Sequence, residues 1–167
     1  MLHVFKSLPV AREVCRADAL PAAASSYGRD TITLGWEERL KTRARRRSDA
    51  GLEFGTALPR GAMLHAGDCL LLDAERIVVE VVEGAEAVFV IRPSSAEQWG
   101  VFAYFIGNSH QPMMVADDAI ICPDVPGMDQ VLDYHEIPFT RDRRSFTPVS
   151  VLGEAVGARH QHAPPLR

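Results

Sequence analysis

The feature of this sequence that most constrains its fold is a strict alternation of basic residues. Five of them occupy every second position: Arg39, Lys41, Arg43, Arg45 and Arg47. Alternate side chains of a β-strand lie on one face, whereas the same positions on a helix spread around the cylinder. The alternation therefore outweighs the helix propensity of WEERLKTRARRR and predicts a strand.

The residues that follow complete a hairpin. SDAG (48–51) is typical of a turn, and the next apolar and threonine side chains again alternate: Leu52, Phe54, Thr56 and Leu58. Further on, CLLLDAERIVVEVVEG (69–84) predicts two strands around a turn near 73–75. Short strands at this spacing predict that residues 1–80 form an all-β domain, a small sandwich or half-barrel.

After Gly84 the pattern changes from strands alone to strands and helices. Residues 87–93 predict a buried strand, and the serines that follow suit a helix N-cap. Gly107 is the residue expected just past the end of this helix. Its apolar face has helical spacing and comprises Trp99, Phe102, Phe105 and Ile106.

The remaining segments complete a recognisable order. Residues 111–122 predict one or two short strands, 123–136 a second helix and IPFT (137–140) a further strand. The order β-α-β-(β)-α-β predicts a ferredoxin-like (βαββαβ) domain over 81–149. Residues 150–167 are rich in Gly, Ala and Pro, which predicts a flexible, histidine-containing C-terminal tail. The fold class expected is therefore α+β.

Composition excludes several classes of protein. The net charge is −4, which does not suit a chain that binds nucleic acid as a whole. No apolar run approaches the roughly 18 residues that span a bilayer, and the N-terminus lacks the pattern of a signal peptide. The cysteines are odd in number and far apart, which favours reduced thiols and a cytoplasmic location.

Three histidines are candidate metal ligands. His110 ends the GNSH sequence after the first helix, where it could be a ligand, a general base or an ordinary surface residue. His160 and His162 form HQH, which either offers two imidazoles on one side of an extended chain or belongs to a solvated tail. Imidazole suits nickel, copper and zinc, and a two-fold dimer would bring two copies of His110 together.

Motifs for catalysis are missing from the sequence. It contains no GxSxG, P-loop or GxGxxG, and neighbouring carboxylates on a strand would point to opposite faces. A binding protein is therefore expected rather than an enzyme.

The basic strip from Arg39 to Arg47 has three possible roles. It could be a solvated strand face that discourages aggregation, a docking face for an acidic protein, or an RNA-binding face. The net charge of −4 favours a protein partner, and an RNA- or ribosome-associated β-domain protein is the alternative.

Several segments together resemble the UreE family of urease accessory nickel chaperones. They occur in the family's order: LGWEERLKTRARRRSDAGLEFGTALPRG (34–61), HAGDCLLL (65–72), FAYFIGNSHQPMMV (102–115), MDQVLDY (128–134), and F-x-P followed by GEAVGARHQH (146–162). WEER-x-K-x-R and GN-x-H in combination are far more specific than either alone. The histidine of GN-x-H is the family's metal-binding position.

The resemblance implies both a function and a site. It implies a β-rich N-terminal domain for partner binding and a ferredoxin-like domain that forms a homodimer. It also implies delivery of Ni(II) for assembly of the urease active site, with the GTPase UreG and the urease apoprotein as partners. His110 would be the nickel ligand from each subunit, and His160 and His162 the tail ligands. Zn(II) or Cu(II) could substitute, while membrane and nucleic-acid partners are not expected.

The sequence departs from the family pattern in two places. It has HQH where many relatives carry a long polyhistidine tail, so high-capacity nickel storage is not expected. It also has ICPDVPG (121–127) where many relatives have H-x-H before the second helix. Cys122 could act there as a soft ligand or be a buried thiol.

Overall fold

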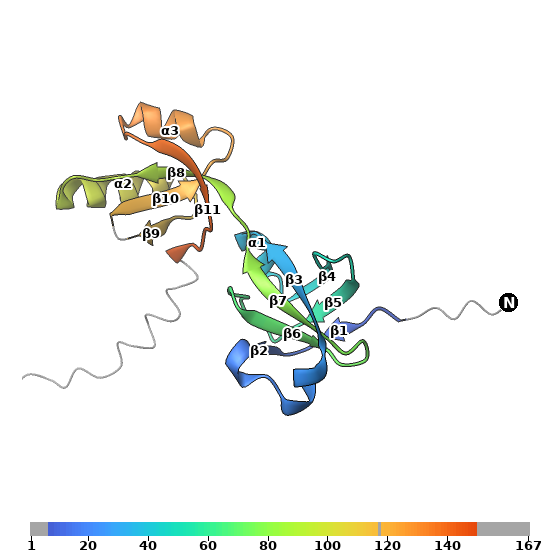
Figure 1. The fold of residues 1–167 in the computed structure, drawn as a ribbon. Coiled ribbons are helices and arrows are strands. Elements are labelled where there is room, and N and C mark those ends of the chain that lie inside the picture. The colour runs from blue at the N-terminus through green and yellow to red at the C-terminus, as the bar shows by residue number, and fades with distance from the viewer. Residues whose placement is uncertain (1–6, 117, 150–167) are drawn as a thin grey trace, which may run out of the picture. The chain divides into compact units, whose positions relative to one another are not determined.

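The computed structural model describes residues 7–116 and 118–149, and it divides the chain into two compact units. The N-terminal unit is Met1–Gly84 and the C-terminal unit is Ala85–Arg167. The first is built mainly of strands and the second of strands and helices, as Figure 1 shows. The expected α+β class is confirmed.

The N-terminal unit contains two small sheets. One has the order β1-β5-β4 and the other the order β2-β6-β7-β3. The pairs β1–β5 and β3–β7 are parallel, and the remaining pairs are antiparallel. The strands are β1 (Val10–Ala11), β2 (Val14–Arg16), β3 (Gly28–Leu34), β4 (Arg43–Arg47), β5 (Glu53–Ala57), β6 (Asp68–Leu72) and β7 (Ile77–Glu83).

Alternating apolar residues of both sheets form the core of this unit. The buried cluster comprises Ala11, Phe54 and Leu58 from one side and Ile32, Leu34, Leu70, Leu72, Val79 and Val81 from the other, together with Leu64. Side chains on one face of each sheet thus pack against the facing sheet. The expected small sandwich or half-barrel is confirmed, as are the strands on either side of the turn at 73–75.

The strand expected over Arg39–Arg47 is wrong in its first half. Residues Trp36–Leu40 form the short helix α1, and β4 begins only at Arg43. The hairpin itself is present, because β4 and β5 pair in antiparallel register from Arg43↔Ala57 to Arg47↔Glu53. The helix propensity of this segment prevails because Arg39, in α1, has its side chain buried and paired inside the unit.

The segment between β2 and β3 contains two short 3-10 helices. They are η1 (Ala17–Ala19) and η2 (Ala22–Ser26). Ala24 of η2 is buried against Cys69 and Val78, on the face of the β2-β6-β7-β3 sheet that is turned away from the main core. This segment therefore covers the second face of that sheet.

The C-terminal unit has the ferredoxin-like topology. Its sheet has the order β11-β8-β10-β9, and every pair in it is antiparallel. The elements are β8 (Glu86–Ile91), α2 (Ala96–Asn108), β9 (Met114–Ala116), β10 (Ala119–Pro123), α3 (Met128–Tyr134) and β11 (Thr140–Arg144). The predicted order is confirmed, although the last strand begins at Thr140, where the expected one ends.

Both helices of this unit pack on one face of the sheet. The buried cluster combines Phe89 and Ile91 of β8 and Ile120 and Cys122 of β10 with Phe102, Ile106, Met128, Leu132 and Ile137. Trp99 and Phe105 pack against it while half-buried, so the predicted apolar face of α2 is confirmed. No helix in the described part of the chain has the length and apolar composition needed to cross a membrane.

Candidate metal centre

His110 follows the C-terminus of α2. The helix begins after Ser95, whose hydroxyl oxygen accepts a hydrogen bond from the Gln98 amide at 3.2 Å. Gly107 was expected to end it, but the helix continues through Asn108, with Ser109 as its C-cap. The left-handed residue is His110 itself, with φ of 58°. The backbone therefore turns at the candidate ligand.

Ser109 fixes the base of this turn. Its amide donates to the carbonyls of Phe105 and Ile106, and its hydroxyl donates to the Ile106 carbonyl at 2.6 Å. The same oxygen lies 3.8 Å from the sulfur of Met128, the first residue of α3. The turn is thereby held between two helices, while His110 is exposed. We did not anticipate this role of Ser109, although serine is a common residue at helix ends.

The end of α2 favours a cation near His110. Carbonyl groups in the last turn of a helix carry partial negative charge, which stabilises nearby positive charge. The 13-residue helix α2 ends one residue before the Ser109 cap. The His110 amide donates to the Gly107 carbonyl at 3.0 Å, which keeps this residue against the helix end. A metal ion bound by the imidazole would therefore lie in a favourable field.

One described chain supplies a single imidazole at this place. Within residues 7–116 and 118–149, no three His, Cys, Asp or Glu side chains come together in a way that could hold a metal ion. The two other predicted ligands, His160 and His162, lie outside the described residues. The described residues of one chain therefore do not supply a complete set of three side-chain ligands around a metal at His110.

The ionisable groups in and around α3 have structural contacts. Cys122 is fully buried in β10, and burial raises the pKa of its thiol to about 12, with Asp124 contributing. The ring of His135, at the end of α3, stacks on Phe105 with centroids 3.7 Å apart. Asp129 pairs with Arg141 at 3.2 Å. The burial of Cys122 therefore favours the buried thiol of the two roles expected from the sequence.

The basic strip is shorter in the structure than in the sequence. Arg43, Arg45 and Arg47 are exposed on one face of β4, and Arg45 pairs with Glu53 at 2.6 Å. Lys41 lies at the end of α1 and pairs with Glu38. The exposed basic strip in the structure therefore consists of Arg43, Arg45 and Arg47.

Arg39 is inside the N-terminal unit, with 1% of its surface exposed. Its guanidinium donates to Glu83 at 3.0 Å and to the Leu64 carbonyl at 3.4 Å. It links α1 to the end of β7 and to the segment before β6. This corrects its expected place on an exposed strand face, because a buried guanidinium is retained where its donors are paired.

Arg46 is a second buried arginine, which sequence reasoning missed. Its Nε donates to the Thr56 hydroxyl at 3.2 Å, and its Nη2 donates to the carbonyls of Lys41 at 2.8 Å and Glu38 at 3.0 Å. Burial lowers the pKa of this guanidinium. The sequence gives one signal for this. Arg46 is the one basic residue of RARRR that falls outside the every-second-position pattern, so its side chain lies on the inward face of β4.

Two family models match the chain along most of its length. The N-terminal domain of the UreE urease accessory protein matches residues 13–83, and the C-terminal domain of the same protein matches residues 86–165. These matches correspond closely to the two compact units.

Curated relatives agree with the family models. A urease accessory protein UreE from Streptococcus vestibularis is 33% identical over 114 residues, which is 68% of this chain and 75% of the relative. One from Citrobacter koseri is 31% identical over 145 residues, covering 86% and 93%. One from Bacillus cereus is 32% identical over 116 residues, covering 69% and 76%.

A β-rich unit followed by a ferredoxin-like unit, each matched by its own family model, defines a two-domain urease accessory protein. The chain is a member of the UreE urease accessory protein family.

Proposed function

We propose that this protein is a nickel carrier that delivers Ni(II) for assembly of the urease active site. The observation that supports it most directly is His110, an exposed imidazole at the C-terminus of α2, in the GN-x-H sequence shared with the family. Imidazole nitrogen is a suitable ligand for Ni(II), and the helix end favours the positive charge.

A dimer through the C-terminal unit would complete the site. One described chain offers a single imidazole here, so two chains related by a two-fold axis would offer two. Exposed apolar side chains of the C-terminal unit suit such an interface: Val101 and Tyr104 lie three residues apart on α2, the helix that leads to His110, and Val115 lies on the edge strand β9. Tyr104 is 65% exposed and therefore offers apolar area that a partner could cover.

The proposed ligand set suits a carrier. Two copies of His110 with His160 or His162 supply about three or four nitrogen ligands, and water completes the shell. An open site of this kind releases its metal more readily than a closed cage of four protein ligands. Zinc or copper can occupy the same ligands, since intrinsic affinity ranks Cu(II) above Ni(II).

The partners proposed for delivery are UreG and the urease apoprotein. The exposed arginines of β4 are a suitable docking face for an acidic segment of such a partner. Their charge would chiefly accelerate association and make it sensitive to salt. In this proposal the protein acts in the cytoplasm and binds and transfers metal without catalysing a reaction.

The test is a calorimetric nickel titration of the metal-free full-length protein, with molar mass measured by light scattering in the same buffer. We expect a dimer that binds about one nickel ion per two chains in its tight phase. His110→Ala should remove this phase and weaken nickel binding by about a hundredfold or more. Unchanged affinity and stoichiometry in His110→Ala, or a 1:1 complex of a monomer, would overturn the proposal.

A matched control shows whether the loss of nickel binding is specific to His110 or follows from removing any exposed imidazole. His65→Ala removes another exposed histidine, located in the turn before β6 of the N-terminal unit, and should leave the titration unchanged. Replacing His160 and His162 together should weaken the tight phase while keeping its stoichiometry. Acidification should weaken binding in the wild-type protein, because protons compete with nickel for imidazole nitrogen.

An RNA-associated role is the alternative for the arginines of β4. It would require RNA affinity that falls steeply with salt and is lost when Arg43, Arg45 and Arg47 are replaced together. The pairing of Arg45 with Glu53 leaves less free positive charge on this face than the sequence suggests. We therefore favour the protein partner.

A further inference from the structure

Two cysteines of the N-terminal unit lie directly opposite each other. Strands β2 and β6 pair in antiparallel register, with Cys15 opposite Cys69. The next pair in the register is Arg16↔Asp68, and Arg16 Nη1 lies 2.8 Å from Asp68 Oδ1. This ion pair joins the neighbouring position of the same register in which the two cysteines are opposite each other. Both cysteines are free thiols in the structure.

The register brings the two thiols within reach of a disulfide. Residues directly opposite on antiparallel strands project their side chains on the same face, and their Cα atoms are about 4.5 or 5.5 Å apart. Both spacings fall within the roughly 4.4–6.8 Å found for disulfide-bonded cysteines. The Cβ atoms of such a pair are about 4.5–5.5 Å apart, against roughly 3.5–4.5 Å in a disulfide, so the two strands must also approach each other slightly for the bond to form.

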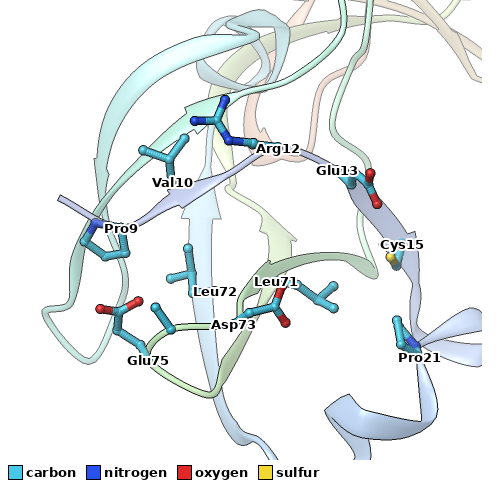
Figure 2. A pocket seen from close by; sticks show the side chains of 11 residues that line it. Pro9, Val10, Arg12, Glu13, Cys15, Pro21, Leu71, Leu72, Asp73 and Glu75 are labelled. Atoms are coloured by element: carbon cyan, nitrogen blue, oxygen red, sulfur yellow. The ribbon is translucent and has the colours of Figure 1, made fainter. Parts of the chain in front are cut away.

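The two thiols differ in their access to solvent. Cys15 is half-buried and lines a pocket of about 560 Å³ between the β1–β2 segment and the β6–β7 turn. Figure 2 shows it on the β2 side of this pocket, with Leu71 and Asp73 on the β6–β7 side. Cys69 is fully buried beneath Ala24. A small oxidant can therefore reach Cys15 from the pocket and cannot reach Cys69 directly.

The environment of Cys69 favours a role as the second thiol. Burial, assisted by nearby Glu80, raises the pKa of the Cys69 thiol. A buried thiol of this kind reacts slowly with oxidants from solution. It reacts readily with a sulfur atom that is held beside it, because the step is then intramolecular.

We propose that Cys15 and Cys69 are a modification site at which a low-molecular-weight disulfide such as oxidised glutathione converts the paired thiols into an intrachain disulfide. The Cys15 thiolate attacks one sulfur of oxidised glutathione, forming a mixed disulfide and releasing one glutathione thiolate. Cys69 attacks the Cys15 sulfur, the bond between Cys15 and glutathione breaks, and the departing second glutathione thiolate takes up the Cys69 proton. Two protein thiols are oxidised and one glutathione disulfide is reduced to two thiols.

The bond would covalently join β2 to β6 and close one wall of the pocket. This inference does not depend on nickel binding, because the thiols belong to the N-terminal unit and His110 to the C-terminal unit. Oxidation should therefore raise the thermal unfolding temperature of the N-terminal unit while leaving nickel stoichiometry unchanged.

Peptide mapping of the full-length protein tests the proposal. The protein is incubated with oxidised glutathione, its remaining thiols are alkylated under denaturing conditions, and it is digested with trypsin without reduction. We expect the peptide 13–16, which contains Cys15, to be linked to the peptide 61–76, which contains Cys69. Cys122 should be recovered alkylated in the peptide 77–141. Links that involve Cys122 or join two chains, or three alkylated thiols after the incubation, would overturn the proposal.

Single variants test the order of the two steps. In Cys69→Ala the mixed disulfide at Cys15 should accumulate, because nothing resolves it. In Cys15→Ser, modification of Cys69 should be slower by about tenfold or more, because this thiol is buried. Cys122→Ala is the matched control and should form the 13–16 to 61–76 link as the wild-type protein does. Equal rates for Cys15 and Cys69 in the two single variants would contradict the order.

Discussion

The two units of this protein use ionisable side chains in opposite ways. All the polar or charged side chains found buried in the described residues belong to the N-terminal unit: Arg39, Arg46, Ser48, Thr56 and Asp68. The buried side chains of the C-terminal unit are apolar, and its histidine at the end of α2 is exposed. Charged side chains are buried in one unit, whereas in the other the ion pairs lie nearer the surface and an exposed imidazole follows a helix end.

The difference shows that a run of basic residues does not by itself mark a binding surface. Arg39 and Arg46 belong to the most basic segment of the sequence, yet both guanidinium groups hold the β-rich unit together. Small sandwiches with short strands leave backbone carbonyls unpaired at their edges, and a long side chain with several donors can reach them. In the ferredoxin-like unit the corresponding bond, from Arg143 Nη2 to the Ala85 carbonyl at 2.9 Å, comes from an arginine that is not buried.

Each unit contains one tryptophan, so the two can be followed separately. Trp36 lies in α1 and Trp99 in α2, and the chain has no other tryptophan. Replacing either one with phenylalanine leaves a fluorescence probe for the other unit alone. Urea unfolding of the two single-tryptophan variants therefore gives a separate transition for each unit.

The largest effect is expected in the apolar core of the C-terminal unit. Ile106→Ala removes a fully buried side chain at the contact between α2 and the sheet, which should lower the free energy of unfolding of this unit by about 4 kcal/mol. The Trp99 transition should move to lower urea and the Trp36 transition should not. Ile106→Val is the matched control, with an expected cost of about 1 kcal/mol. Equal shifts of both transitions would show that the units do not unfold independently.

A somewhat smaller effect is expected from removing a buried charge in the other unit. Arg39→Ala leaves Glu83 and the Leu64 carbonyl without this donor, and we expect a loss of about 3 kcal/mol in the stability of the N-terminal unit. Here the Trp36 transition should move and the Trp99 transition should not. Nickel stoichiometry should also be unchanged. If Arg39→Ala lowers the free energy of unfolding no more than a substitution at an exposed position does, the structural role of Arg39 is contradicted.

A third prediction concerns the link between the β4–β5 turn and β3. Asp49 accepts hydrogen bonds from the hydroxyls of Thr31 at 2.6 Å and Thr33 at 3.1 Å and from the Thr33 amide at 3.2 Å. Asp49→Ala should destabilise the N-terminal unit by about 1 kcal/mol, since water competes for an exposed carboxylate.

The pH dependence of this effect has a definite sign. The threonine hydroxyls, and the amide of Thr33, hold the pKa of the Asp49 carboxyl below its ordinary value of 3.8. The stabilisation is therefore present at neutral pH and is lost as pH falls through the lowered pKa. The difference in stability between the wild-type protein and Asp49→Ala should be constant from about pH 7 to 5 and should narrow below about pH 4. A difference that grows on acidification would contradict this assignment.

The smallest effect on stability is expected at the exposed arginines of β4. Replacing Arg43, Arg45 and Arg47 with glutamine should leave both unfolding transitions in place, because exposed ion pairs contribute little. Association with an acidic partner protein should become slower and less dependent on salt. Arg39→Gln provides the contrast, because it should destabilise the unit without changing the exposed charge of β4. A large loss of stability in the triple variant would show that these side chains also hold the fold together.

Much of the fold could be predicted from local periodicity. The alternation in 43–57 gives the β4–β5 hairpin, and the spacing of Trp99, Phe102 and Ile106 gives the buried face of α2. The order of strands and helices after Gly84 gives the ferredoxin-like topology. The place of His110 beside a helix end follows from GNSH, because glycine and asparagine are typical of helix C-termini.

The start of the basic segment could not be predicted in the same way. Alternation shows which side chains share a face if the segment is a strand, but it does not show which distant element covers them. Arg39 is buried because Glu83, 44 residues away, and the Leu64 carbonyl meet its guanidinium. That contact exists only in the folded unit, and it selects the helix over the strand.

The sequence by itself determined the periodic elements, their order and the family, because these depend on residues close together in the chain. The tertiary structure alone decided which arginines are buried, that His110 adopts the left-handed turn, and that Cys15 lies opposite Cys69. Each of these depends on the register or packing of segments that are far apart in the chain. Local patterns carry no information on that pairing, since its free energy comes from contacts formed only on folding.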